Sequence, residues 1–186
     1  MAGFVARWLS DVVRIGLPLA LALAAMQVPA VAHNYASALL QIAQDARRDI
    51  EQRKASARQY YRSAGDSDEA VVEALRAVEP ANAQALAASV ERARALRAAH
   101  DRIEAAPPLL RPVTALLDAA QDPRGDKRAV LATALDTHAP QVVLSAAAAV
   151  YGLIGLALGS FVAELLVSAA GLLVPARRDR AARLAR

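Results

Sequence analysis

The chain contains no cysteine among its 186 residues, and only 4% of its residues are aromatic. The absence of cysteine excludes disulfides, zinc sites with thiolate ligands and cysteine nucleophiles. The shortage of aromatic side chains argues against an ordinary soluble core, which draws heavily on Phe, Tyr and Trp for buried area. Alanine and leucine dominate instead, and this composition is typical of closely packed helices.

Net charge is absent from the middle of the chain. Residues 33–140 contain fifteen Lys and Arg and fifteen Asp and Glu, so the formal charge of +4 comes from the two ends. Arg7 and Arg14 outweigh Asp11 at the front, and five arginines outweigh a single aspartate at the back. Basic residues that flank apolar runs indicate a membrane protein. Basic residues interleaved with aromatic ones, as in nucleic-acid binding, are missing, so we expect no nucleic-acid partner.

Motifs that carry chemistry are also missing. The sequence has no HExxH pair, no glycine-rich phosphate loop and no GxSxG elbow, so we predict no catalytic residue, no cofactor and no enzyme activity. His33 and His138 should reach the same outer surface, where Asp136 would complete a weak divalent or pH-sensitive contact. Interfacial histidines bonded to water are commoner, so no metal site is predicted. His100 is expected on the exposed side of a charged helix without a partner.

The first apolar segment covers residues 15–32 and carries no charge. Its length is near the lower end of what crosses a bilayer as a helix, roughly 17–25 residues. We place Pro18 in its first turn and expect Pro29 to kink or end it. Gln27 should face a protein neighbour rather than lipid.

A cleaved signal peptide is the alternative for residues 1–32, because Ala30-Val31-Ala32 fits a small-x-small cleavage site. The charged region before the apolar run would then be long, and it contains Trp8 and Asp11. We therefore favour an uncleaved anchor.

The second apolar segment covers residues 141–174, with Glu164 as its only charge. A continuous helix of this length measures about 50 Å, against roughly 30 Å for the hydrocarbon core. We prefer residues 142–162 in the membrane and 165–174 along the inner surface. The alternative projects the alanine-rich start outward and places Glu164 deep. In the preferred arrangement, Arg14 and Glu164 form an ion pair, and a proton or ion relay through Glu164 is less favoured.

Three glycines mark a helix-packing face on the second segment. Gly152, Gly155 and Gly159 fall on or near one side, and Gly155-x-x-x-Gly159 is a small-xxx-small pattern that permits close helix approach. We expect this face to serve the contact between the two spans of the chain, with self-association or a partner helix as the second possibility.

The first fourteen residues are predicted to form a separate amphipathic helix in the plane of the membrane. Its apolar residues are Phe4, Trp8, Leu9 and Val12, and its polar residues are Arg7, Asp11 and Arg14. The alternative is a frayed extension of the first span. With the basic tail at 175–186, the positive flanks place both termini in the cytoplasm of a bacterial inner membrane and the central domain in the periplasm.

Residues 33–140 are predicted to form an all-α, antiparallel helical bundle. We expect helices at 34–62, from Asp66 to 78, at 82–104, 109–117 and 126–135. Asp66 and Glu69 form a capping box at the start of the second of these. The many arginines and carboxylates are interpreted mainly as a solvated face with weak local ion pairs. A charged docking surface is the less favoured interpretation.

Several short features resemble a family of small bacterial inner-membrane proteins catalogued as a domain of unknown function. They are Gln27-x-Pro29 at the end of the first span, Tyr35 opening a long charged helix, and a glycine-containing last span entered through Asp136 and Pro140. Ala30 and Ala139 depart from the aromatic or acidic residues expected beside the prolines. The resemblance implies two spans and supplies no catalytic residues.

The leading hypothesis is a non-enzymatic membrane protein that binds lipid and other integral membrane proteins, or itself, as an accessory or assembly subunit. The alternative is a sensor or signalling module with a periplasmic helical input domain. A cytoplasmic tail of about twelve residues is too short for an output domain, which weakens that alternative. An enzyme or transporter ranks third.

Overall fold

The computed structural model describes the backbone of residues 2–61, 66–140 and 145–184, and within these the side chains from Phe4 to Gly171 except that of residue 6. Every regular element in these residues is a helix, which confirms the predicted all-α fold. The chain divides into two compact units. The hairpin unit comprises residues 1–30 and 140–186, and the central unit comprises residues 31–139.

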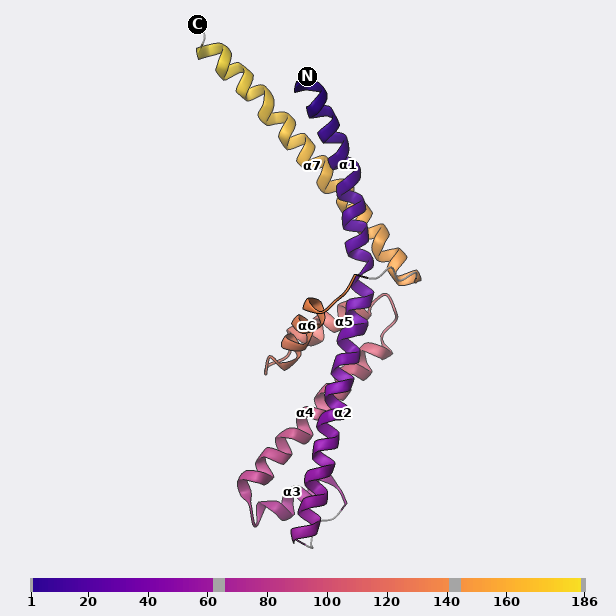
Figure 1. Cartoon of the computed structure of the whole chain (residues 1–186), viewed down its shortest axis with the longest axis vertical. Coiled ribbons are helices and arrows are strands. Elements are labelled where there is room, and N and C mark those ends of the chain that lie inside the picture. The colour runs from indigo at the N-terminus through magenta and orange to yellow at the C-terminus, as the bar shows by residue number, and fades with distance from the viewer. Residues whose placement is uncertain (1, 62–65, 141–144, 185–186) are drawn as a thin grey trace. The chain divides into compact units, whose positions relative to one another are not determined.

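The hairpin unit is built from α1 (Ala2–Met26) and α7 (Ala146–Leu184), which run antiparallel and cross in contact (Figure 1). α1 passes through residue 14 without a break, so residues 2–14 continue the same helix instead of forming a separate element. This differs from the sequence-based prediction. The segment has no helix-breaking residue at its end, because the glycine at position 16 is tolerated within a helix. Residues 141–144, where the second segment was predicted to begin, lie outside the described residues.

The two prolines of the first segment are placed differently from the prediction. Because α1 begins at Ala2, Pro18 lies inside the helix rather than in its first turn, and its side chain is buried. The helix ends at Met26, and Gln27 forms a turn before α2 (Val28–Tyr61) begins. Pro29 therefore stands in the first turn of a new helix, where a missing N–H removes no hydrogen bond.

The central unit contains most of α2 and four further helices, which are α3 (Asp68–Arg76), α4 (Pro80–Ala105), α5 (Arg111–Ala120) and α6 (Asp126–Asp136). Each corresponds to a predicted helix, with ends shifted by a few residues. α3 is capped by Ser67, whose side chain accepts a hydrogen bond from the Ala70 backbone N–H. The predicted cap, Asp66, precedes it by one residue, and Gly125 opens α6 with a φ of 78°.

The central unit has two apolar cores, which lie at opposite ends of the α2–α4 pair. The first core contains Tyr35, Leu39, Leu96 and Ile103 with small residues of α5 and α6. The second contains Ile50 and Leu86 with Val71, Val72 and Leu75 of α3. The early part of α2 thus packs with the late part of α4, so these two long helices are antiparallel (Figure 1).

Candidate functional site

A seam of small residues on α7 contacts α1. Ala148, Gly152, Gly155, Gly159 and Ala163 are all buried, although their larger neighbours on α7 are exposed. They recur at intervals of three or four residues, which places them on one face of the helix. The three glycines singled out from the sequence therefore lie together at the α1–α7 contact.

Backbone atoms of α1 occupy the space that side chains would need at this seam. A Cβ at Gly155 would lie 2.5 Å from the Leu21 carbonyl oxygen and 2.7 Å from the Ala25 Cβ. A Cβ at Gly159 would lie 2.5 Å from the Pro18 Cα. At Gly152 the nearest atom is the flexible Met26 side chain, at 2.8 Å. Gly155 and Gly159 thus permit an approach that no other residue type allows.

Arg14 and Glu164 join the same two helices. Arg14 Nε lies 3.1 Å from Glu164 Oε1, and its Nη2 donates to Glu164 Oε2 at 3.3 Å. Two parallel N–H···O contacts make this a bidentate pair. About half of each side chain is exposed, at 47% and 60%, so the pair lies at the edge of the seam and not inside it.

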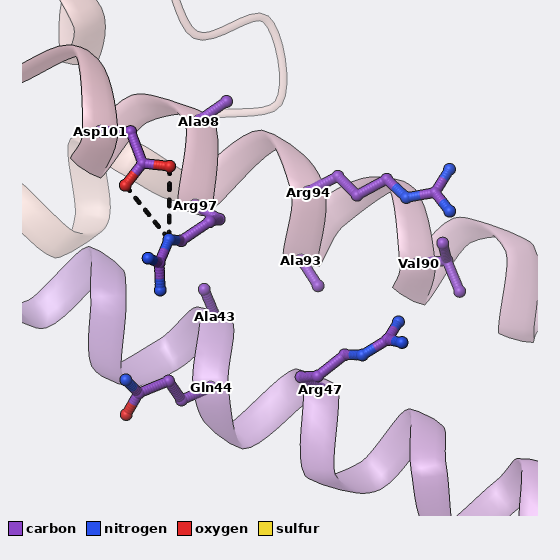
Figure 2. Close-up of a pocket in the computed structure, with 9 residues that line it drawn as sticks. All are labelled: Ala43, Gln44, Arg47, Val90, Ala93, Arg94, Arg97, Ala98 and Asp101. Atoms are coloured by element: carbon purple, nitrogen blue, oxygen red, sulfur yellow. Dashed lines mark hydrogen bonds and ion pairs between the residues drawn. The ribbon is translucent and has the colours of Figure 1, made fainter. Parts of the chain in front are cut away.

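A groove of about 410 Å³ lies between α2 and α4 in the central unit (Figure 2). Ala43, Val90 and Ala93 are buried and form its apolar floor, where the two cores meet. Exposed arginines stand along it, Arg47 from α2 and two others from α4. The volume falls within the range typical of ligand pockets, roughly 300–1,000 Å³.

The α4 arginines of the groove are Arg94 and Arg97, and each is oriented by carboxylates. Arg97 Nε contacts both carboxylate oxygens of Asp101, at 3.1 and 3.3 Å, and its terminal nitrogens point toward α2 (Figure 2). Arg94 Nη2 lies 2.6 Å from Glu69 of α3. The groove thus combines an apolar floor with guanidinium groups held in fixed orientations. This combination is chemically suited to a ligand that carries an apolar group next to an acidic one.

Beside the groove, the carboxylate of Asp68 is buried among cations. Arg47 Nη1 lies 2.5 Å from Asp68 Oδ2, and Lys54 Nζ lies 2.9 Å from Oδ1. Lys54 is itself 3% exposed. Although burial alone would raise the pKa of Asp68, the hydrogen bonds from Lys54 and Arg47 outweigh it and hold the pKa below its ordinary value. This cluster ties α3 to α2.

A second buried carboxylate, Asp118, joins four helices. It faces inward from α5 and accepts hydrogen bonds from Tyr35 Oη of α2 at 3.2 Å and from Lys127 Nζ of α6 at 2.9 Å. Arg102 of α4 forms the third contact, which like that of Lys127 is an ion pair. Burial raises the pKa of Asp118, but the hydrogen bonds from Lys127 and Arg102 lower it by more than burial raises it. The pKa of Asp118 therefore lies below its ordinary value.

These two aspartates predict a loss of stability in acid. Aspartates of the unfolded chain titrate near pH 3.9, and the folded-state pKa of Asp68 and of Asp118 is lower. Their stabilisation is therefore complete above about pH 5 and is lost progressively as the pH falls through the unfolded-state pKa and then the folded-state pKa. We expect the melting temperature of the full chain in mild detergent to fall between pH 5 and pH 3. The double variant Asp68→Asn, Asp118→Asn should melt lower at pH 7 and show a flatter acid decline; an unchanged decline would contradict this assignment.

The three histidines do not converge. His138 Nδ1 lies 3.3 Å from Asn34 Nδ2, His33 is exposed, and the described residues contain no group of three or more His, Asp or Glu side chains placed to hold a metal. His100 is half-buried, and its Nδ1 lies 3.0 Å from the Ala36 carbonyl oxygen. The prediction that His100 has no partner was wrong, because α4 packs against α2 at that point.

Sequence reasoning missed both buried carboxylates, which had been assigned to a solvated face. A signal was present for Asp118, since it shares a helix face with the apolar residues Ala115 and Ala119, and all three are buried. Asp68 carries the same signal, because it shares a helix face with Val71, Val72 and Leu75 at spacings of three, four and seven residues, and all four are buried.

The outer faces of the hairpin unit remain apolar and exposed. The stretch Arg7–Tyr61 and the stretch Ala146–Gly171 each contain an uncharged or weakly charged window that is long and apolar enough to cross a membrane. Only 11% and 17% of these windows are buried. Exposed large side chains include Leu19, Leu23, Leu153, Leu158 and Phe161.

The chain matches a known protein family. The family profile described as "Protein of unknown function (DUF2937)" matches residues 9–176, which include both apolar segments and the whole central unit. No curated protein and no solved structure matches the chain. The expected resemblance to a family of unknown function is therefore confirmed, and the chain belongs to the DUF2937 family.

Proposed function

We propose that the chain is an integral membrane protein in which α1 and α7 cross the bilayer, and that it acts as a non-enzymatic accessory or assembly subunit for other membrane proteins. The observation that carries the proposal is the exposed apolar surface of the hairpin unit. A soluble protein buries a helix this apolar in its core, whereas the two windows here are 11% and 17% buried. Lipid is the solvent in which such a surface is stable.

The fit between α1 and α7 supports a retained N-terminal anchor over a cleaved signal peptide. A signal peptide has no need of a complementary surface, but here Pro18, Leu21 and Ala25 of α1 occupy the space that a side chain at Gly155 or Gly159 would need. The Arg14–Glu164 pair adds a matched charge to the same contact. With five arginines after Val174, these features favour both termini in the cytoplasm of a bacterial inner membrane and the central unit in the periplasm.

The groove between α2 and α4 supports a role in partner binding. Its floor is apolar, and its arginines are of the residue type enriched in interface cores. Asp101 holds the Nε side of the Arg97 guanidinium in place. The terminal nitrogens of Arg97 can therefore bind an acidic group without the entropy cost of ordering the side chain. We propose that an acidic segment of the partner occupies this groove.

The proposal is tested by purifying tagged full-length protein in mild detergent and identifying its N-terminal peptide and stoichiometric companions by mass spectrometry. The decisive comparison uses Ala98→Trp, which places a large ring in the groove, and Ala95→Trp as the control. Ala95 is also exposed on α4 but does not line the groove. We expect an intact N-terminus, a membrane-protein companion, and at least a tenfold loss of that companion in Ala98→Trp only, equivalent to about 1.4 kcal/mol.

Equal recovery with both tryptophan variants would contradict binding in the groove. A mature chain that begins after Ala32 would overturn the two-span arrangement, and an intact chain without companions would contradict the accessory-subunit role.

A further inference from the structure

An apolar face of α5 projects from the central unit. Leu110, Val113, Leu116 and Leu117 are between 49% and 61% exposed. At 100° per residue they span an arc of about 120°, as in a helix with one apolar side. The opposite side of the same helix is buried in the protein through Pro112, Ala115, Asp118 and Ala119. α5 thus has apolar residues on both sides, and only one side is covered by the described residues.

The orientation of this face is fixed by contacts on the other side of α5. Asp118 points inward and is held by Tyr35, Arg102 and Lys127, which come from three different helices. Arg111, the only charged residue between Pro107 and Leu117, bends back to donate to the carbonyl oxygens of Glu104 and Ala106. The exposed face therefore carries no charge, and α5 cannot rotate to bury it without breaking these bonds.

Within the central unit, α5 lies at the end where the chain enters and leaves. Ala32, at the end of the first apolar segment, belongs to the same buried cluster as Ala115 and Ala119 of α5. The last residues of the unit return to this end, since His138 contacts Asn34. α5 thus lies at the end of the central unit where its first and last residues, next to α1 and α7 in the chain, come together.

We propose that α5 is an interfacial helix whose Leu110–Leu117 face inserts into the lipid surface at the foot of the central unit. This inference rests on the proposed function, because it requires α1 and α7 to span that bilayer. A helix with one apolar face lies in the interface with this face roughly 5–10 Å deep among the headgroups and upper acyl chains. In an ordinary interfacial helix the opposite face is polar and exposed to water. In α5 the central unit covers that face, and this packing holds the helix at a fixed depth in the membrane surface.

The absence of cysteine permits a direct test on the full chain in nanodiscs of phosphatidylcholine and phosphatidylglycerol. A spin label at Leu116→Cys is compared with labels at Leu158→Cys on α7 and Tyr60→Cys at the far end of α2. All three side chains are exposed in the structure, at 61%, 58% and 75%. The measurement is the accessibility of each label to oxygen, which concentrates in lipid, relative to a nickel chelate, which stays in water.

We expect the oxygen-to-nickel ratio at Leu116 to be several-fold above that at Tyr60 and close to that at Leu158. A water-like ratio at Leu116 with a lipid-like ratio at Leu158 would overturn the interfacial helix and leave the spans intact. Water-like ratios at both positions would overturn the proposed spans as well. Protection of Leu116 from both reagents would show a protein covering the face, either a second copy or a partner, and would also overturn the proposal.

Discussion

Replacing Gly155 with leucine is expected to separate α1 from α7. Even the first atom of the new side chain would lie 2.5 Å from the Leu21 carbonyl oxygen, a backbone atom that cannot move independently of its helix. Overpacking of this kind typically costs 1–3 kcal/mol, and we expect on the order of 3 kcal/mol here because four side-chain atoms must be accommodated. Gly155→Ala should have a smaller effect in the same direction, despite the better helix propensity of alanine.

Spin labels at Leu19→Cys and Leu158→Cys would report this separation by pulsed EPR, since Pro18 and Gly159 meet at that level of the hairpin. We expect the label distance to lengthen and its distribution to broaden in Gly155→Leu. Gly16→Leu is the matched control, because a Cβ at Gly16 meets nothing within 4 Å. A distance distribution in Gly155→Leu that matches the control would show that the seam is not a close contact in the protein.

Replacing Asp118 with alanine is expected to be the most destabilising change in the central unit. It removes the acceptor shared by Tyr35, Arg102 and Lys127 and leaves Lys127, whose side chain is 13% exposed, without its partner. Loss of one member of a buried ion pair typically costs about 3–5 kcal/mol. For a unit of this size, that corresponds to a fall in melting temperature on the order of 10 °C or more.

Thermal unfolding of the full chain in mild detergent, followed by circular dichroism, measures this effect. Asp45→Ala is the control, since Asp45 is 61% exposed and pairs only locally with Arg48, three residues further along its own helix. We expect a change within about 0.5 kcal/mol there. Asp118→Asn should fall between the two, because the amide keeps a hydrogen-bond acceptor but loses the charge. Equal melting temperatures for Asp118→Ala and Asp45→Ala would contradict the role of Asp118.

The parts of the fold that follow from local sequence were predictable. Helix positions in the central unit follow from apolar periodicity and from breaks at Gly65, Pro80 and Pro107-Pro108, and the structure places them within a few residues of the prediction. The two apolar segments were identifiable from length and lack of charge alone. The glycine spacing on α7 indicated a packing face. Only the structure shows that this face lies against Leu21 and Pro18 of α1.

Features that depend on pairing between distant segments were not predictable. The groove exists because Ala43 and Ala93 face each other across antiparallel helices, and neither residue is unusual in the sequence. The cations that meet Asp68 were likewise not predictable, because Lys54 comes from another helix. The boundary predicted at residue 14 failed for a simpler reason: a change of polarity does not interrupt a helix when no residue breaks it.

The division of the central unit into two cores has a consequence for how it can open. The core around Ile50 and Leu75 contains all of α3 but shares only α2 and α4 with the core around Tyr35. Cooperative unfolding units often coincide with such separately packed motifs. The end that contains α3 can therefore fray and close again while the end that contains α5 stays folded.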